Sequence, residues 1–425
     1  RGLYTLGEHK MTATYESARA IFANWNVDAE AALARLAQVA ISIHSWQGDD
    51  VRGFEGLTAA SGGGIQATGN FPGRARNPAE LRADLDFALS QIPGRHRLNL
   101  HAFYMDTEDT PDRDEIEYKH FVPWVDWAKD SDIKLDFNPT FFAHPKADDN
   151  LTLSHPDAGI REFWIEHGRR TREIAAQMGQ ALGSPAINNI WVPDGSKDIP
   201  VDRMAARQRL EKALDTMLSE KFDQSRLIDA VESKLFGIGV EAMTVGSHEF
   251  YLGYAIRRKI ALCLDMGHFH PTENIADKLS AVALSVPEIL LHVSRPMRWD
   301  SDHVILLTDE ILQMAQELVF TDLLERTHIG LDFFDATISR TAAWVVGVRN
   351  MQKALLRALL LPQKRLKSLE HNLDFTGRLV LTEELKDLPF SAVWNEFCAR
   401  QNVPVGAQLM DSLAAYQSSV SGRDG

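Results

Sequence analysis

The chain has 425 residues, of which 44% are hydrophobic and 24% are charged, as is typical of a globular protein. Its 45 Lys and Arg residues against 59 Asp and Glu residues give a formal net charge of −14 at pH 7. Because phosphate groups are bound by basic surfaces, this charge argues against a nucleic-acid or anionic-membrane partner. No apolar run reaches the roughly 18 to 20 residues that a membrane-spanning helix needs, so no membrane partner is expected.

The chain contains two cysteines, Cys263 and Cys398. Two cysteines exclude a disulfide framework and a Cys-rich zinc site, and Cys263 is expected to be a buried small hydrophobe. No secretory signal is visible, which favours a cytoplasmic protein. Residues 1–10 precede Met11 and lack the helix-like pattern of the residues after it, so we interpret them as a tag or leader outside the fold.

Short β-rich runs alternate along the chain with stretches of helical periodicity. The eight predicted strands cover residues 41–47, 97–104, 134–142, 186–193, 227–234, 260–268, 289–294 and 327–334. The main predicted helices between them cover residues 78–92, 159–178, 207–218 and 309–320. Strand–helix alternation indicates parallel βαβ units, and eight such units favour an α/β fold of the (β/α)8 TIM-barrel type over an open sheet. The absence of a G-x-G-x-x-G after the first strand also argues against a Rossmann fold.

The pattern becomes purely helical after residue 336. Residues 339–362 predict a long helix that ends at a proline, and two further helices are expected near 382–400 and 404–421. We therefore predict a catalytic barrel over residues 11–345, including an N-terminal helix, and a C-terminal helical extension over 346–425. The Gly-rich segment 61–73 favours a flexible surface loop, and a mobile lid over the barrel mouth is the alternative.

Potential metal ligands stand at the ends of four successive predicted strands and in the loop after the seventh strand. They are Glu232, Asp265, His268, His292, Asp300, Asp302 and Asp332. Active sites of (β/α)8 barrels lie at the carboxyl ends of the strands, where these residues would meet. Carboxylates suit Mg²⁺ or Mn²⁺, and the imidazoles extend the choice to Co²⁺ or Zn²⁺. Because seven ligands exceed the needs of one cation, two metal ions are plausible, with Glu232 as a shared carboxylate.

Other polar and aromatic residues are predicted at the same mouth. Lys234 follows Glu232 by two residues, and on its own the pair is as readily a structural ion pair as a catalytic one. Single His or Trp residues at strand ends usually serve packing. Several together predict a sugar-sized pocket in which aromatic faces meet C–H surfaces. The candidates are Trp46, His101, Phe142 and Trp191.

The chain resembles bacterial L-rhamnose isomerases over nearly its whole length, from about residue 14 onward. The strings that carry the resemblance include SIHSWQGDDV, LDFNPTFFAHP, DAVESKLFGIG, CLDMGHFHPTE, LHVSRPMRWDSDH and HIGLDFFDA. The resemblance implies a (β/α)8 barrel with a helical C-terminal extension and a cytoplasmic homotetramer. It also implies conversion of L-rhamnose to L-rhamnulose with divalent metals, commonly two Mn²⁺ ions per subunit, with Zn²⁺ or Co²⁺ as alternatives.

The resemblance also implies roles for individual residues. Glu232, Asp265, His292 and Asp332 match the ligands of a structural metal, and Glu232, His268, Asp300 and Asp302 match those of a catalytic metal. Trp46, His101, Trp191 and Lys234 are then expected to line the substrate site, and Phe142 joins them on its predicted place at the end of the third strand. The catalytic candidates are Lys234, Asp302, Asp332 and His101, in a metal-assisted 1,2-hydride shift. A cis-enediol route would instead need a base beside the C2 proton.

Other functions remain as alternatives. A related sugar isomerase or epimerase with a different preferred aldose is the nearest rival, and a product assay separates the two. A metallohydrolase would usually show H-x-H at the end of the first strand, where this chain has His44 and Trp46. The net charge disfavours a two-metal nuclease. An inactive barrel that only senses sugar is not supported, because every expected ligand and Lys234 are present.

Overall fold

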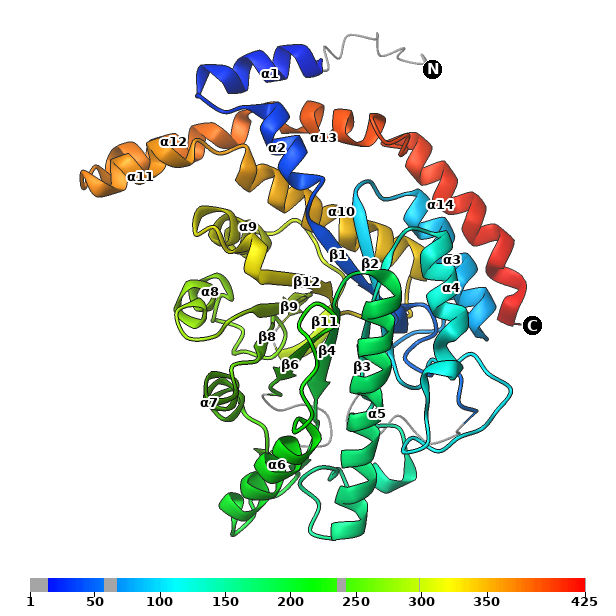
Figure 1. Ribbon diagram of the computed structural model, residues 1–425. Helices are drawn as coiled ribbons and strands as arrows, with labels where there is room; N and C mark the ends of the chain where they lie inside the picture. The colour runs from blue at the N-terminus through cyan, green and yellow to red at the C-terminus, as the bar shows by residue number, and fades with distance from the viewer. Residues whose placement is uncertain (1–13, 57–66, 235–241, 298, 425) are drawn as a thin grey trace, which may run out of the picture.

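An eight-stranded parallel sheet forms the centre of the computed structural model (Figure 1), which describes residues 14–56, 67–234, 242–297 and 299–424, apart from the side chains of 296–301 and 424. The hydrogen-bonded strand order is β3-β2-β1-β12-β9-β8-β6-β4. The strands are β1 (Ala40–His44), β2 (Arg95–His101), β3 (Lys134–Asn138), β4 (Ala186–Trp191), β6 (Leu227–Glu232), β8 (Ala261–Asp265), β9 (Ile289–Val293) and β12 (Thr327–Leu331). All eight predicted strands are confirmed, although each ends earlier than predicted because its last residues already turn into the loops of the mouth.

The sheet closes into a barrel through side chains between β3 and β4, which stand at the two ends of the hydrogen-bonded order. Asp136 Oδ1 accepts a hydrogen bond from the Ile187 amide at 2.9 Å, and Asn138 Oδ1 accepts one from the Asn189 amide at 3.2 Å. Arg97 on β2 donates to Asp136 at 2.7 Å and to the Pro185 carbonyl at 2.7 Å. Polar side chains therefore complete the seam that backbone pairing forms elsewhere in the sheet.

Helices surround this barrel (Figure 1), as the alternating pattern predicts. They are α3 (Pro78–Ser90), α4 (Val122–Asp130), α5 (Ala158–Leu182), α6 (Arg203–Met217), α7 (His248–Arg258), α8 (Ala276–Ala283), α9 (Asp309–Phe320) and α10 (Arg340–Leu359). Helix α5 is typical in its ends: Asp157 caps it by accepting from the Ile160 amide, and it stops at Gly183 with φ of 64°. None of the helices within the described ranges combines the length and apolar character needed to cross a membrane.

Apolar side chains occupy part of the barrel interior below the mouth. Alternate strand residues face inward, and Ile187, Ala230, Ala261, Cys263 and Leu290 form one buried apolar cluster. The Cys263 side chain is 1% exposed, which agrees with the predicted buried hydrophobe. The buried polar residues Ser42, Asn99 and Asp136 line a cavity there together with Ile187 and Leu290, so the interior below the mouth is mixed in polarity.

Two short antiparallel pairs of strands at the loops were not predicted. One pairs β5 (Gly195–Ser196) with β7 (Met243–Thr244) across α6 and β6, and the other is a hairpin of β10 (Arg295–Met297) and β11 (Trp299–His303). Runs of two to five residues are too short to show an alternating pattern. The β10–β11 hairpin directly follows β9 and carries two of the predicted ligand positions.

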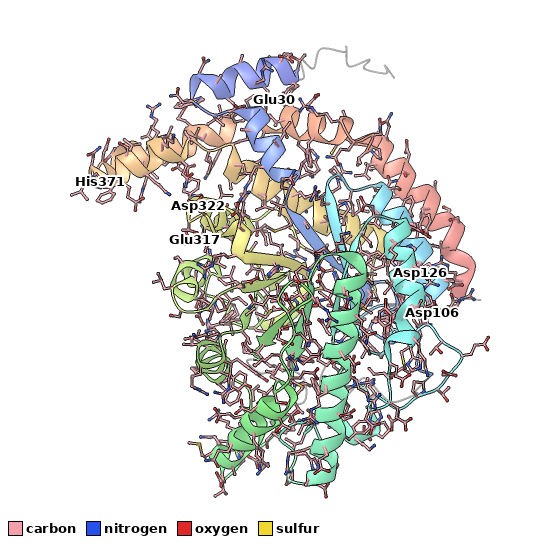
Figure 2. The ribbon with its side chains drawn as sticks, in the orientation of Figure 1. Glu30, Asp106, Asp126, Glu317, Asp322 and His371 are labelled. Carbon is pink, nitrogen blue, oxygen red and sulfur yellow. The ribbon has the colours of Figure 1, made fainter. Side chains whose placement is uncertain are left out.

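The terminal helices differ in detail from the prediction. Two helices, α1 (Tyr15–Asn24) and α2 (Ala29–Leu36), precede the barrel where one was expected, and the extension contains α11 (Gln363–His371), α12 (Phe375–Glu384), α13 (Phe390–Ala399) and α14 (Ala407–Val420). The helix predicted near 382–400 is confirmed as α13, but it begins later than predicted, because the residue before Pro389 adopts an extended conformation and separates α12 from α13. Arg400 pairs with Glu30, labelled in Figure 2, at 2.7 Å and joins the two ends of the chain. The predicted leader, residues 1–10, lies outside the described residues.

The Gly-rich segment predicted as a loop or lid is described only in part, because residues 61–66 lie outside the described ranges. Its later part pairs with the turn after β12: the Phe71 amide donates to the Ala336 carbonyl at 2.8 Å. Gly69 has φ of 120°, and a Cβ there would lie 2.3 Å from the Ala336 carbonyl oxygen. Glycine is therefore required where this segment crosses the turn.

Candidate metal centre

Four of the predicted ligands meet at the carboxyl end of the barrel. Glu232 ends β6, Asp265 ends β8, His292 lies near the end of β9 and Asp332 directly follows β12. One ligand atom from each lies within 4.8 Å of all the others. His292 Nδ1 is 3.3 Å from Glu232 Oε2, 3.6 Å from Asp265 Oδ2 and 3.3 Å from Asp332 Oδ2. The parallel register, which places Asp265 opposite His292, brings these strand ends to one level.

The polar atoms of this cluster fit a bound cation. Glu232 Oε1, Asp265 Oδ2 and His292 Nδ1 are buried and have no hydrogen-bond partner among the described residues. Buried polar atoms are normally hydrogen-bonded, and three carboxylates around one imidazole carry an excess of negative charge that a divalent cation would neutralise. Burial lowers the pKa of His292, but the carboxylates of Glu232, Asp265 and Asp332 raise it, and its pKa is well above the usual value.

Cys263 is close enough to Glu232 and His292 to be considered as a ligand. Burial raises the pKa of its thiol far above the usual range. A thiol binds metals as the thiolate, so Cys263 is a poor ligand beside three carboxylates.

His268 lies next to the cluster through Glu232. Its Nδ1 is 3.3 Å from Glu232 Oε1, while His292 faces the other oxygen of the same carboxylate. The turn that carries His268 is held by Asp265, whose Oδ1 accepts from the Gly267 amide at 2.6 Å. Glu232 therefore stands between two imidazoles, as a shared ligand would.

The hairpin after β9 carries Asp300 and Asp302. The side chain of Asp300 lies outside the described residues. Asp302 has φ of 33°, in the left-handed region, and its carbonyl accepts from the Phe334 amide at 3.2 Å. The hairpin therefore leans against the end of β12, beside Asp332.

The predicted aromatic residues form one continuous wall at the mouth. Ring centroids are 4.9 Å apart for Trp46 and His101, 5.4 Å for His101 and Phe142, and 5.8 Å for Phe142 and Trp191. Lys234 is buried, and its Nζ lies 5.0 Å from the centre of the Trp191 ring. Trp46 Nε1 donates to Asp332 Oδ1 at 2.9 Å and so connects the wall to the carboxylate cluster.

Three of these residues lie beyond the strands in which they were predicted. Trp46 is in a 3-10 turn after β1, Phe142 is in the turn after β3, and Lys234 lies two residues beyond the end of β6. Strand alternation therefore does not explain why Lys234 and Glu232 share the mouth. The Lys234 amide instead donates to the Gly246 carbonyl at 3.2 Å, which fixes the chain there.

The hydrogen bonds of His101 define its protonation. Its Nδ1 is 3.2 Å from both the Pro139 carbonyl and Thr140 Oγ1. A carbonyl only accepts, so Nδ1 carries the proton and Nε2 is left as an acceptor. Burial lowers the pKa of His101 to about 3, and the ring is neutral at neutral pH.

Sequence reasoning missed Asn189. Its Nδ2 donates a short hydrogen bond to Glu232 Oε2, and its amide belongs to the seam that closes the barrel. Asn189 occupies an inward position of β4, two residues before Trp191. That alternation was the available signal, although it does not reveal the partner.

An eight-stranded barrel with carboxylates and imidazoles at the carboxyl ends of its strands has the architecture of a barrel enzyme with a metal site. The family model of L-rhamnose isomerase (RhaA) matches residues 9–423. Curated L-rhamnose isomerases of Salmonella paratyphi A and Salmonella typhimurium are each 57% identical over 411 residues, covering 97% of this chain and 98% of theirs. The chain therefore belongs to the L-rhamnose isomerase family.

Solved structures of other barrels are more distant. A D-allulose 3-epimerase from Methylomonas sp. is 11% identical and has a TM-score of 0.47, with 75% of this chain and 98% of that chain covered. The barrel assignment rests on this chain's own strand order and pairings.

Proposed function

We infer that this chain is an aldose–ketose isomerase that interconverts L-rhamnose and L-rhamnulose, the first step of L-rhamnose breakdown. Membership of the family and full-length 57% identity to curated L-rhamnose isomerases support the reaction and the substrate. The observation that carries the site is the convergence of Glu232, Asp265, His292 and Asp332 at the barrel mouth.

We propose two divalent cations, of which Mn²⁺ is the first choice and Zn²⁺ or Co²⁺ the alternatives. Glu232, Asp265, His292 and Asp332 would hold the first, and Glu232, His268, Asp300 and Asp302 would hold the second. Bound cations of this kind act as Lewis acids that stabilise negative charge on the sugar oxygens.

The proposed reaction moves hydrogen from C2 to C1 with its electron pair, while the O2 hydroxyl gives up a proton and O1 gains one. Lys234 would stabilise charge developing on O1, and the burial of its ammonium group beside Trp191 supports this role. Asp302 or Asp332 takes part in passing on the hydroxyl proton. His101 offers a neutral Nε2 acceptor that orients the sugar or assists ring opening.

The aromatic wall of Trp46, His101, Phe142 and Trp191 would bind the C–H face of the sugar and exclude water. An aromatic pocket of this kind would suit an isomerase or an epimerase, whereas membership of the family favours the isomerase. The product therefore has to be identified. Chromatography of the product from L-rhamnose would show L-rhamnulose, whereas a 2-epimeric aldose would contradict the proposal.

Heavy water distinguishes the two proton-transfer routes. A hydride shift keeps the migrating hydrogen on carbon, so L-rhamnulose formed in D₂O should carry little deuterium at C1 by NMR. Extensive incorporation at C1 would instead indicate a cis-enediol route with a carbon base.

We also propose a cytoplasmic homotetramer. Cys263 and Cys398 are both free thiols, which suits a reducing compartment. The arm of α11 and α12, whose end carries His371 in Figure 2, exposes Leu373 by 73%, Leu379 by 63% and Val380 by 56%. Such apolar exposure supports contact with another subunit. Sedimentation should give four times the 47.6 kDa of one chain, and a monomer would contradict this proposal.

A further inference from the structure

A buried arginine outside the predicted site supports the sugar-facing wall. Arg113 lies in the long connection between β2 and α4, and its side chain is 1% exposed. Its guanidinium donates to the carbonyls of Thr140 at 2.5 Å, Phe142 at 2.7 Å and Ala143 at 3.2 Å. These three carbonyls belong to the turn after β3, in which Ala143 has φ of 53°. Three carbonyls of this turn therefore accept hydrogen bonds from the Arg113 guanidinium group.

The same guanidinium is paired with a carboxylate from another loop. Arg113 Nε donates to Glu55 Oε1 at 3.0 Å, and Nη2 donates to Glu55 Oε2 at 2.9 Å. Glu55 comes from the connection after β1 and is itself 9% exposed. Two parallel hydrogen bonds fix the plane of the guanidinium, so that its remaining N–H groups point at the turn.

His167 of α5 holds the turn from a second side. Its Nε2 accepts from the Thr140 amide at 2.9 Å, and its Nδ1 donates to the Arg113 carbonyl at 2.9 Å. Thr140 in turn places its hydroxyl 3.2 Å from His101 Nδ1. The position of the His101 ring therefore depends on a turn that Arg113 and His167 hold in place.

We propose that Arg113 is a positioning residue for substrate binding, acting through the turn at 139–143 on His101 and Phe142. This inference rests on the proposed function, because the sugar is taken to bind against these two rings. The guanidinium of Arg113 contacts Glu55 and the turn but none of the proposed metal ligands among the described residues. Its loss should therefore weaken sugar binding and leave metal affinity unchanged. Lysine cannot replace it, since a single ammonium group cannot serve one carboxylate and three carbonyls at fixed angles.

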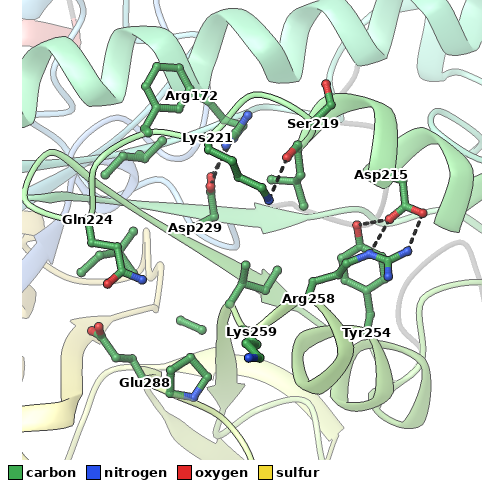
Figure 3. Close-up of a pocket in the computed structure, with 17 residues that line it drawn as sticks. Arg172, Asp215, Ser219, Lys221, Gln224, Asp229, Tyr254, Arg258, Lys259 and Glu288 are labelled. Atoms are coloured by element: carbon green, nitrogen blue, oxygen red, sulfur yellow. Dashed lines mark hydrogen bonds and ion pairs between the residues drawn. The ribbon is translucent and has the colours of Figure 1, made fainter.

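The opposite end of the barrel offers a matched control, shown in Figure 3. Arg172 is also buried, and it donates to Asp229 Oδ1 at 3.0 Å and Oδ2 at 2.9 Å. It also donates to the carbonyls of Met217 and Glu220, both at 2.9 Å. Both arginines therefore pair with one carboxylate and donate to backbone carbonyls of a neighbouring segment. Arg172, however, lies at the amino-terminal ends of the strands, away from the mouth.

The experiment compares Arg113→Lys with Arg172→Lys in the metal-loaded full chain. Measured quantities are KM and kcat for L-rhamnose, the melting temperature, and Mn²⁺ affinity by calorimetry after stripping. Both variants should lose thermal stability, but only Arg113→Lys should lower kcat/KM, by about 10- to 100-fold and mainly through KM, with unchanged Mn²⁺ affinity. Equal KM in both variants and wild type would overturn the proposal, as would a loss confined to metal affinity.

A second pair of variants, with smaller changes, is used if either lysine variant fails to fold. Glu55→Gln and Asp229→Asn keep side-chain volume and remove one charge from the two equivalent networks. Only Glu55→Gln is expected to raise KM, and equal KM values would again overturn the proposal.

A second readout is independent of turnover. The ¹⁵N resonances of His101 in histidine-labelled protein should shift in Arg113→Lys and Glu55→Gln but not in the Arg172 and Asp229 variants. Unchanged His101 resonances in all four would overturn the positioning role. A wild-type chain that does not convert L-rhamnose would contradict the proposed function instead, and the two failures are thereby distinguished.

Discussion

Among single residues, the barrel mouth buries charged side chains that are normally exposed to water. Lys234 is 2% exposed, and Glu232 on the preceding strand is equally buried. Burying an ammonium group is costly unless nearby charges or an aromatic face stabilise it. Trp191 supplies such a face, and the carboxylates supply charge. We therefore expect the site to depend on the Lys234 charge and not merely on its volume.

Lys234→Met tests this dependence. Methionine keeps the approximate length and apolar stem but removes the positive charge that would stabilise O1. The turnover number should fall by roughly 10² to 10³, as when one stabilising donor is removed from an active site, while Mn²⁺ content stays intact. Near-normal turnover would reduce Lys234 to the structural ion-pair role that its spacing from Glu232 also allows.

At the scale of elements, the seam between β3 and β4 is the least conventional part of the barrel. Asp136 on β3 accepts hydrogen bonds from Ser42 on β1, from Arg97 on β2 and from the Ile187 amide on β4. One carboxylate therefore links β3 to three other strands. Although burial raises its pKa, Arg97 and the other donors lower it by more, and the net shift is downward. The carboxylate is therefore ionised in the folded chain.

Asp136→Ala should lower the free energy of unfolding by about 3 to 5 kcal/mol, because it leaves Arg97 without its partner in a largely buried place. Urea unfolding at neutral pH measures this change. Ser42→Ala, which removes only one donor to the same carboxylate, is the matched control and should cost about 1 kcal/mol. Equal losses in the two variants would show that the seam does not depend on the Arg97–Asp136 pair.

The elements also show what the sequence could and could not predict. Strand runs and their polar ends were recognisable, because alternation and strand-end carboxylates follow from local chain geometry. The break before Pro389 was not predicted, so the helix expected near 382–400 was placed too early in the chain. Arg113, His167 and Asn189 could not be assigned, because each depends on partners 27 or more residues away. Such partners become visible only once the chain is folded.

At the scale of the whole molecule, several buried imidazoles link stability to pH. Burial lowers the pKa of His44 and His96 to about 4 and of His101 and His167 to about 3. Below the unfolded pKa of about 6.5, the unfolded chain binds protons that the folded chain does not. Their contribution to stability is therefore lost as the pH falls from about 6.5 toward their folded pKa values.

Carboxyl groups whose pKa is raised by burial act in the opposite direction, and among the described residues they are Asp49, Asp84, Asp114 and Asp194. Burial raises the pKa of Asp49 to about 7, so the folded chain holds a proton there that the unfolded chain releases above about 4. Asp49 offsets roughly one of the four imidazoles. Between pH 6 and pH 5, the free energy of unfolding of the metal-free chain should fall by roughly 2 to 4 kcal/mol. Urea titrations at the two pH values measure it, and an unchanged or higher value at pH 5 would contradict the assignment of neutral buried imidazoles.

We propose that the carboxylates and imidazoles at the barrel mouth form a metal-dependent site for isomerising L-rhamnose. The most direct measurement is formation of L-rhamnulose by chelator-stripped protein, with and without added Mn²⁺. We predict negligible turnover after stripping and recovery on addition of Mn²⁺. Full turnover by metal-free protein would contradict the metal site, and no turnover by folded, Mn²⁺-loaded protein would contradict the substrate.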